Sequence, residues 1–186
     1  LGIKQQTVVY NSLLGINAQY TTLFLQTALS RVTQRYSFGA SADYGIGGYN
    51  NSDLYIKGHY KQSFKDKLLI VASIKSMRYE TAFANAFLFS NHFIWQNSFK
   101  KQQDISGTIS AAIGKKNPVL LEWSSALKGN FVYFSANGQP EQLSAAFLWT
   151  KIKTSQQIKW GWFGNRNTLV YQKSGSDKIP IPQFII

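Results

Sequence analysis

Apolar and polar residues alternate with a period of two through most of this 186-residue chain. Residues 54–61 show the pattern, with apolar positions on one side of the backbone and polar positions on the other: Leu54, Ile56, Gly58 and Tyr60 against Tyr55, Lys57, His59 and Lys61. Because successive side chains of a strand point to opposite sides, this stretch predicts a β-strand with one apolar face.

The same alternation recurs from end to end, in residues 12–20, 36–45, 68–75, 105–113, 119–131 and 158–163. Residues 79–89 scan as a short helix, but no cap or lasting helical period supports one. The pattern therefore predicts an all-β chain, an antiparallel up-and-down meander of about 10–12 strands. We expect residues 1–186 to form one unit without an internal domain boundary.

The predicted strands are long, and their polar sides carry small uncharged residues. Alternation often persists for about ten residues, the length at which a tilted strand crosses a bilayer. A soluble sheet usually turns charged residues to water, whereas Ser, Thr, Gly and Asn suit a wet lumen. These features favour a transmembrane β-barrel, or a partial, open barrel wall, with its apolar face in lipid.

Loop lengths add a second indication of a barrel, because outer-membrane barrels have short periplasmic turns and longer external loops. We expect the turns at 63–67, 99–104 and 164–167 on one side of the sheet. The Gly/Asn-rich loop at 45–53 and the long segment at 78–91 then fall on the other side, together with the short turn at 114–118.

Net charge is +12, from 20 Lys and Arg against 8 Asp and Glu. Such an excess suggests nucleic acid, an anionic membrane surface or an anionic solute as a partner. Many of the lysines fall in turns, where solvation alone explains them; at an outer rim they would instead neutralise lipopolysaccharide phosphates.

The polar faces supply the candidate lumen-lining residues: Asp43, Lys57, His59, Lys61, Lys75, Glu122, Lys128 and Lys159. Six of the eight acids look bound to turns (Asp53, Asp66, Glu80, Asp104, Glu141 and Asp177), which leaves only Asp43 and Glu122 within strands. Since charged rings set pore selectivity, we expect a passive channel for small solutes that favours anions.

Signatures of catalysis are missing. The chain has no cysteine and two histidines, His59 and His92, neither with an acid nearby in sequence. No nucleophile elbow or phosphate-binding glycine loop occurs. We therefore expect no enzyme, no metal site and no cofactor.

Aromatic residues make up 15% of the chain and are spread along it. We interpret eight of them as lipid-facing residues or an interfacial belt: Tyr20, Tyr36, Tyr44, Tyr60, Trp95, Trp123, Trp160 and Trp162. Trp160 and Trp162 could equally stack on carbohydrate. The alternative is thus a secreted, soluble β-sandwich or barrel that binds glycans through exposed Trp and Tyr. A nucleic-acid-binding sheet is disfavoured, because the Trp residues mostly alternate away from the charges.

Four stretches together resemble the putative porin family of Bacteroidetes outer membranes: residues 13–32, 36–60, 77–83 and 179–186. The resemblance implies an outer-membrane β-barrel of a Gram-negative bacterium and a pore for small solutes. Family members are longer, so we expect a segment of a larger barrel. Its partners would be the remaining strands, outer-membrane lipid and lipopolysaccharide, and small solutes, but no nucleic acid.

Overall fold

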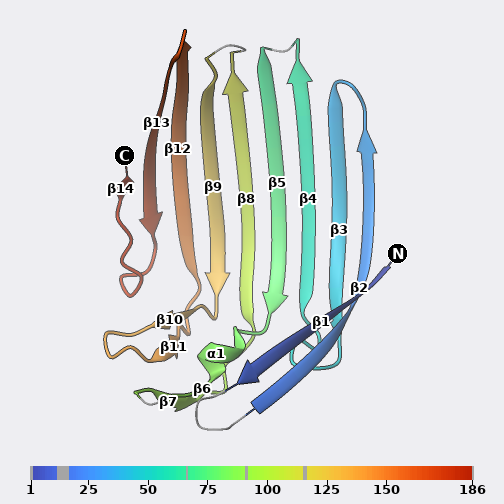
Figure 1. The fold of residues 1–186 in the computed structure, drawn as a ribbon, viewed down its shortest axis with the longest axis vertical. Coiled ribbons are helices and arrows are strands. Elements are labelled where there is room, and N and C mark those ends of the chain that lie inside the picture. Colours follow the sequence, from blue (N-terminus) through green and yellow to red (C-terminus); the bar gives the residue numbers. More distant parts are fainter. Residues whose placement is uncertain (1, 12–16, 66, 91, 115–116, 186) are drawn as a thin grey trace.

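A single curved antiparallel sheet dominates the computed structural model, which describes residues 2–11, 17–65, 67–90, 92–114 and 117–185 (Figure 1). Its strands follow one another in chain order, apart from the two small hairpins described below. They are β1 (Gly2–Asn11), β2 (Asn17–Val32), β3 (Tyr36–Ile46), β4 (Leu54–Phe64), β5 (Leu68–Tyr79), β8 (Gln102–Ile113), β9 (Val119–Gly129), β12 (Phe147–Trp160), β13 (Phe163–Ser174) and β14 (Phe184–Ile185).

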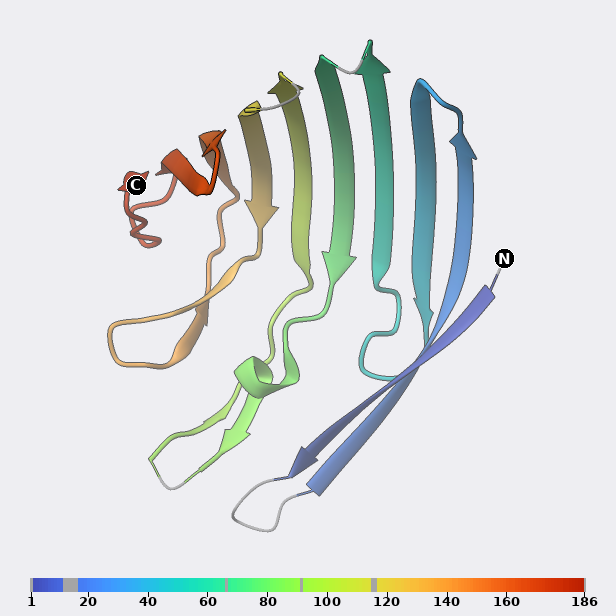
Figure 2. The same cartoon turned by 45° about the horizontal axis from the view of Figure 1, so that its top comes forward.

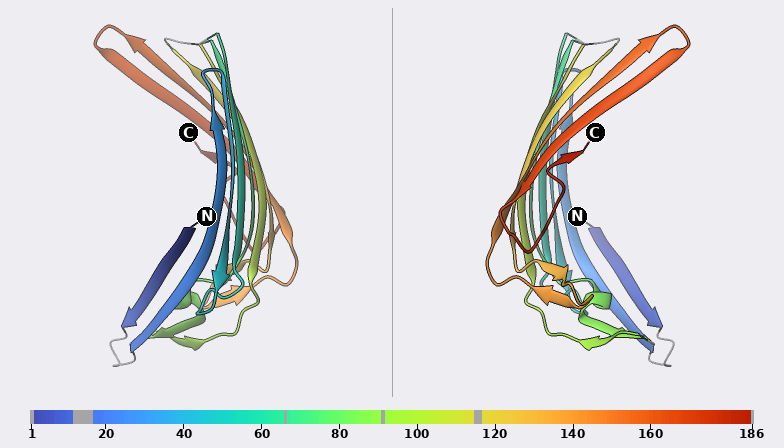
Figure 3. Two further views of the ribbon diagram at one scale, coloured as in Figure 1. Left: turned by 90° about the vertical axis from the view of Figure 1, so that its right-hand side faces the viewer. Right: turned by 90° about the vertical axis from the view of Figure 1, so that its left-hand side faces the viewer.

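The predicted all-β meander is confirmed: the main sheet has 10 strands, within the expected range. The sheet is curved but not closed, with β1 at one edge and β13 and β14 at the other (Figure 3). The glycan-binding alternative required two packed sheets and short strands. Instead, the described residues form one large sheet whose strands, β14 aside, run for 10–16 residues.

Cross-strand register confirms that alternation separates two faces. One row of neighbours crosses seven strands with polar residues or glycine at each position: Gly39, His59, Ser73, Thr108, Ser124, Lys151 and Gln172. The adjacent row is apolar or aromatic throughout: Phe38, Tyr60, Ala72, Ile109, Trp123, Ile152 and Tyr171. We call the side of the first row the polar face and that of the second the apolar face.

The apolar face is uncovered. Nearly all the large apolar side chains that the sheet exposes lie on it, among them Leu29 at 70% exposure and Ile74 at 63%. Soluble monomers rarely expose contiguous apolar patches beyond a few hundred Å². None of the described residues forms a helix long and apolar enough to cross a membrane.

The two ends of the sheet differ. Short turns join β2 to β3, β4 to β5, β8 to β9 and β12 to β13 at one end, which we call the short-turn rim (Figures 1 and 2). Longer connections gather at the other end, the long-loop rim. They carry α1 (Phe83–Ala86), a hairpin of β6 (Phe87–Phe89) with β7 (Ile94–Gln96), and a hairpin of β10 (Val132–Phe134) with β11 (Pro140–Gln142).

This arrangement corrects three expectations about turns. The segment at 99–104 ends a long connection, and the turn at 114–118 lies at the short-turn rim. Residues 164–167 belong to β13, because the chain reverses earlier, at Gly161 and Trp162 between the paired Trp160 and Phe163. Gly161 has a φ of 57°, which favours glycine at this two-residue turn.

The buried core lies on the polar face near the long-loop rim, where the long connections fold back beneath the hollow side of the sheet (Figure 3). Phe147 of the sheet meets Phe131 edge-on, with ring centroids 5.6 Å apart. On the other side of the rim, Phe24 packs against Tyr55 at 6.2 Å. The long connections therefore cover part of the polar face, whereas towards the short-turn rim that face stays open.

Candidate functional site

The eight residues expected to line a lumen all project from the polar face. Alternation and register place Asp43, Lys57, His59, Lys61, Lys75, Glu122, Lys128 and Lys159 on the same side of β3, β4, β5, β9 and β12. Over the described strands this face carries nine Lys and Arg side chains. Five of them are the lysines just named, and the other four are Lys4, Lys151, Lys153 and Arg166. Three acidic side chains oppose them: Asp43, Asp104 and Glu122.

Ion pairs hold Asp104 and Glu122, the two acidic side chains that β8 and β9 contribute to this face. Lys128 Nζ lies 2.5 Å from Asp104 Oδ2 on the neighbouring strand. Lys151 Nζ lies 2.8 Å from Glu122 Oε1. Asp104, expected in a turn, is a buried residue of β8, and the sequence reading missed Lys151 as a wall residue.

Three further basic side chains of the polar face lie close together on β4 and β5. Lys57 lies directly opposite Lys75, and Lys61 lies four residues further along β4 on the same face. Like charges directly opposite each other repel. Among the described residues, none of these three lysines has an acidic oxygen within ion-pair distance. Lys57, Lys61 and Lys75 therefore form a cluster of positive charge on the polar face, which we call the lysine cluster.

Small residues leave room around the lysines. His59 faces Gly39 across the strand pair, and a Cβ at Gly39 would fall 2.5 Å from His59 Cε1, so the imidazole occupies the space of the missing side chain. Hydroxyl groups continue the wall: Thr108 and Ser124 are hydrogen-bonded at 3.1 Å, as are Thr168 and Ser155. Hydroxyl groups thus follow the polar face through β8, β9, β12 and β13.

The aromatic candidates divide among three places. Tyr36, Tyr44, Tyr60, Trp123 and Trp160 lie on the apolar face. Trp162 occupies the turn at the short-turn rim and is 97% exposed. Trp95 lies in β7, outside the main sheet, and donates a hydrogen bond from Nε1 to the Ala84 carbonyl at 3.0 Å. Tyr20 pairs with Val8 in the backbone, but its side chain is outside the described residues.

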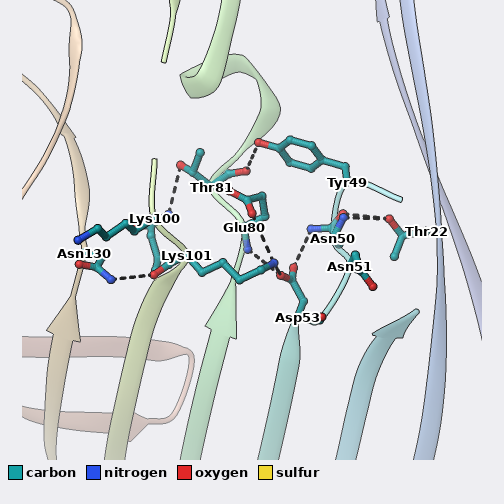
Figure 4. Close-up of polar contacts among 12 residues, drawn as sticks. Thr22, Tyr49, Asn50, Asn51, Asp53, Glu80, Thr81, Lys100, Lys101 and Asn130 are labelled. Atoms are coloured by element: carbon teal, nitrogen blue, oxygen red, sulfur yellow. Dashed lines mark hydrogen bonds and ion pairs between the residues drawn. The ribbon is translucent and has the colours of Figure 1, made fainter. Parts of the chain in front are cut away.

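A buried ionic network holds the long-loop rim together, centred on Asp53 just before β4 (Figure 4). The Asp53 carboxylate is fully buried and forms an ion pair with Lys101. It also accepts hydrogen bonds from Asn50 Nδ2 at 2.8 Å and from the Glu80 backbone N–H at 2.9 Å. Glu80 adds its own carboxylate 3.4 Å from the Lys101 ammonium.

Further hydrogen bonds extend this network, which we call the rim lock, from β2 to the connection after β9. The Asn50 backbone N–H donates a hydrogen bond to Thr22 Oγ1 of β2, and the Thr22 hydroxyl donates to Asn50 Oδ1. The Tyr49 hydroxyl donates to the Thr81 carbonyl at 2.9 Å. Beyond Lys101, Asn130 donates to the Lys101 carbonyl at 3.0 Å. The rim lock therefore joins the connection after β3 to those after β5 and β9.

Sequence reasoning missed the rim lock because its partners lie far apart in the chain. Asp53 and Lys101 are separated by 48 positions, and each alone reads as a turn residue. A weak signal was present in the Gly/Asn-rich loop at 45–53, which contains three glycines. Two of them, Gly45 and Gly48, lie in close contact with backbone atoms. A Cβ at Gly48, where φ is 72°, would fall 2.1 Å from the Thr21 carbonyl oxygen.

Replacing Gly45 with alanine is expected to destabilise the rim, because the new Cβ would fall 2.1 Å from the Asn50 carbonyl oxygen. Backbone must then move, at a cost of about 1–3 kcal/mol in the free energy of unfolding. Urea unfolding of the whole protein in lipid vesicles measures this. Gly164→Ala is the control, since a Cβ there meets nothing within 4 Å; equal stability of the two variants would contradict the expectation.

Comparison with known proteins gives one positive result. A family model described as "Putative porin" matches residues 4–186, which is nearly the whole chain. No curated protein and no solved structure matches.

Proposed function

Because the chain belongs to the putative porin family, we propose that its sheet is part of the wall of an outer-membrane β-barrel pore. Small solutes would diffuse through this pore along the polar face, and anions would be favoured. The proposal contains no catalytic step and no cofactor. Its remaining partners are lipid on the apolar face and further strands along the two open edges.

The observation that carries the proposal is the segregation of the two faces. Exposed Leu, Ile, Phe and Trp side chains follow the apolar side of the sheet, whereas Ser, Thr, Lys and Gln follow the other. In water this apolar face would have to be covered by other parts of the protein, whereas in a bilayer an apolar outer face is required for contact with lipid. Strands of 11–12 residues, such as β4 and β5, match the span of a tilted barrel strand, about 9–11 residues.

The open edges support a pore that further strands complete. An exposed edge carries unpaired backbone N–H and C=O groups, which cannot be left unsatisfied in lipid. Closure into a barrel pairs these groups. Strands supplied by the rest of a longer protein would complete such a barrel and turn the hollow, polar side inwards.

The preference for anions rests on the lysine cluster. Lys57, Lys61 and Lys75 have no ion-pair partner within the part of the chain that the structure describes, whereas two of the three opposing acids are held in ion pairs. A wall of one sign raises the local concentration of oppositely charged solutes. The long connections at the other rim narrow the polar face, so the solutes would be small.

Reversal potentials test the proposal directly. The whole protein, reconstituted into a planar bilayer between KCl solutions of unequal concentration, is expected to conduct and to show a reversal potential of the sign set by chloride. A reversal potential of the sign set by potassium would overturn the preference for anions. A protein that inserts but never conducts would overturn the pore itself.

A further inference from the structure

A cationic hollow opens on the short-turn rim between two neighbouring turns. One turn joins β2 to β3 at residues 33–35, and the other joins β4 to β5 at residues 65–67. The hollow has a volume of about 770 Å³, and its lining includes Arg35, Lys65 and Lys67. The Ser63 N–H donates to the Arg35 carbonyl at 2.8 Å, which fixes the first turn against β4.

The floor of this hollow is apolar and belongs to the apolar face. Phe64 and Leu68 line it and are directly opposite each other across β4 and β5. Phe64 is 41% exposed. The site therefore combines three positively charged groups at the rim with hydrocarbon directly below them. A small hydrated anion gains nothing from contact with apolar side chains. A molecule with an anionic head and an apolar tail matches both the cations and the apolar floor.

Aromatic side chains mark the depth of this hollow in the membrane. Tyr36 and Tyr60 lie on the same apolar face beside it, and the Tyr60 hydroxyl donates to Gln62 Oε1, a lining residue, at 2.7 Å. Tyrosines in this position sit at the level of lipid headgroups. The three cations are thus placed where phosphate groups of a leaflet lie.

We propose that the hollow formed by Arg35, Lys65, Lys67, Phe64 and Leu68 binds one anionic glycerophospholipid, with its phosphate on the cations and its acyl chains along the apolar face. Arginine can hold a phosphate through two parallel hydrogen bonds, and lysine adds charge. Asp66 lies between the two lysines in sequence but outside the described residues, and the sequence leaves an excess of two positive charges. This inference rests on the membrane placement proposed above, not on conduction.

The position of the site selects the leaflet. Short turns of outer-membrane barrels face the periplasm. Lys65 and Lys67, two of the turn lysines that could have met lipopolysaccharide at an outer rim, are thus assigned to the inner leaflet, which consists of phospholipid. At the long-loop rim, by contrast, Lys101 and Lys128 are already paired with Asp53 and Asp104.

Native mass spectrometry of the whole protein, purified in mild detergent, tests the site with two lipid probes of equal chain length, phosphatidylglycerol and phosphatidylcholine. Wild type is expected to retain phosphatidylglycerol preferentially. Lys65→Gln with Lys67→Gln should weaken that binding roughly 30-fold, about fivefold for each basic group near an anionic headgroup. Lys100→Gln with Lys178→Gln removes the same charge at the opposite end and should change it little.

Each outcome decides the question. Equal retention of the two lipids, or equal loss in the two double variants, would overturn the headgroup site while leaving the membrane wall intact. Retention of neither lipid, together with partition into the aqueous phase, would overturn the membrane placement itself. Displacement of phosphatidylglycerol by millimolar inorganic phosphate would show a plain anion site and overturn the lipid assignment.

Discussion

Replacing Asp53 with alanine is expected to lower the free energy of unfolding by about 3–5 kcal/mol, the cost of breaking a buried ion pair from one side. The Lys101 ammonium, only 18% exposed, would lose its main partner and keep only the more distant Glu80 carboxylate. The Asn50 side chain and the Glu80 backbone N–H would also lose their acceptor. Asp53 therefore connects the loop before β4 to both ends of the connection between β5 and β8.

Urea unfolding of the reconstituted whole protein measures this loss, and limited proteolysis reports where it acts. The connections at 80–101 and 130–146 should become sensitive to protease first, because only the rim lock and a small core hold them. Asp177→Asn, on an exposed acid, is the matched control. A stable Asp53→Ala protein with protected connections would show that the ion pair contributes little.

Reversing the charge of the lysine cluster is expected to have the largest effect on the ion selectivity of the pore. Lys57→Glu with Lys75→Glu changes the local charge by four units on the open wall. In water, the Coulomb energy between one unit charge and an ion about 8 Å away is about 0.5 kcal/mol. Screening at about 0.1 M salt reduces the sum. The ratio of chloride to potassium permeability should therefore fall by about tenfold.

A graded series makes this prediction specific. Lys57→Gln with Lys75→Gln changes the charge by half as much at similar size and should give about half the shift in the logarithm of the permeability ratio. Conductance in concentrated salt should stay close to that of wild type in both variants, because the pore width is unchanged. An unaltered ratio in the glutamate variant would place these lysines away from the path of the ions.

The fold was largely predictable because one local rule, alternation, applies along almost the whole sheet. Residues 36–44 and 54–60 assign each side chain to a face without knowledge of its neighbours, and the register agrees at every pair. Predictions were wrong where alternation continues through a reversal. The sequence IKWGWFGN keeps alternating across Gly161 and Trp162, so its turn was placed later, in what is the start of β13.

Charge pairing was less predictable, for a physical reason. Whether Lys128 and Lys151 are free depends on which residue faces them on the next strand, and that depends on register and loop length rather than on local sequence. Asp104 read as part of a turn because it follows a polar run, yet it lies in β8. Only the tertiary structure shows that Lys128 and Lys151 are in ion pairs, whereas Lys57, Lys61 and Lys75 have no such partner among the described residues.

The rim lock also helps to specify the strand register, which the alternation of apolar and polar residues does not fix completely. A strand displaced by one residue turns its polar side chains to the apolar face, but a strand displaced by two keeps every side chain on its proper face. Alternation therefore cannot reject such errors. Asp53 and Lys101 can meet only when β4, β5 and β8 are all aligned as observed, since they approach from opposite sides of that strand group. The buried Asp53 carboxylate thus favours the observed strand register over registers shifted by two residues, which present the same apolar face and would otherwise differ little in energy.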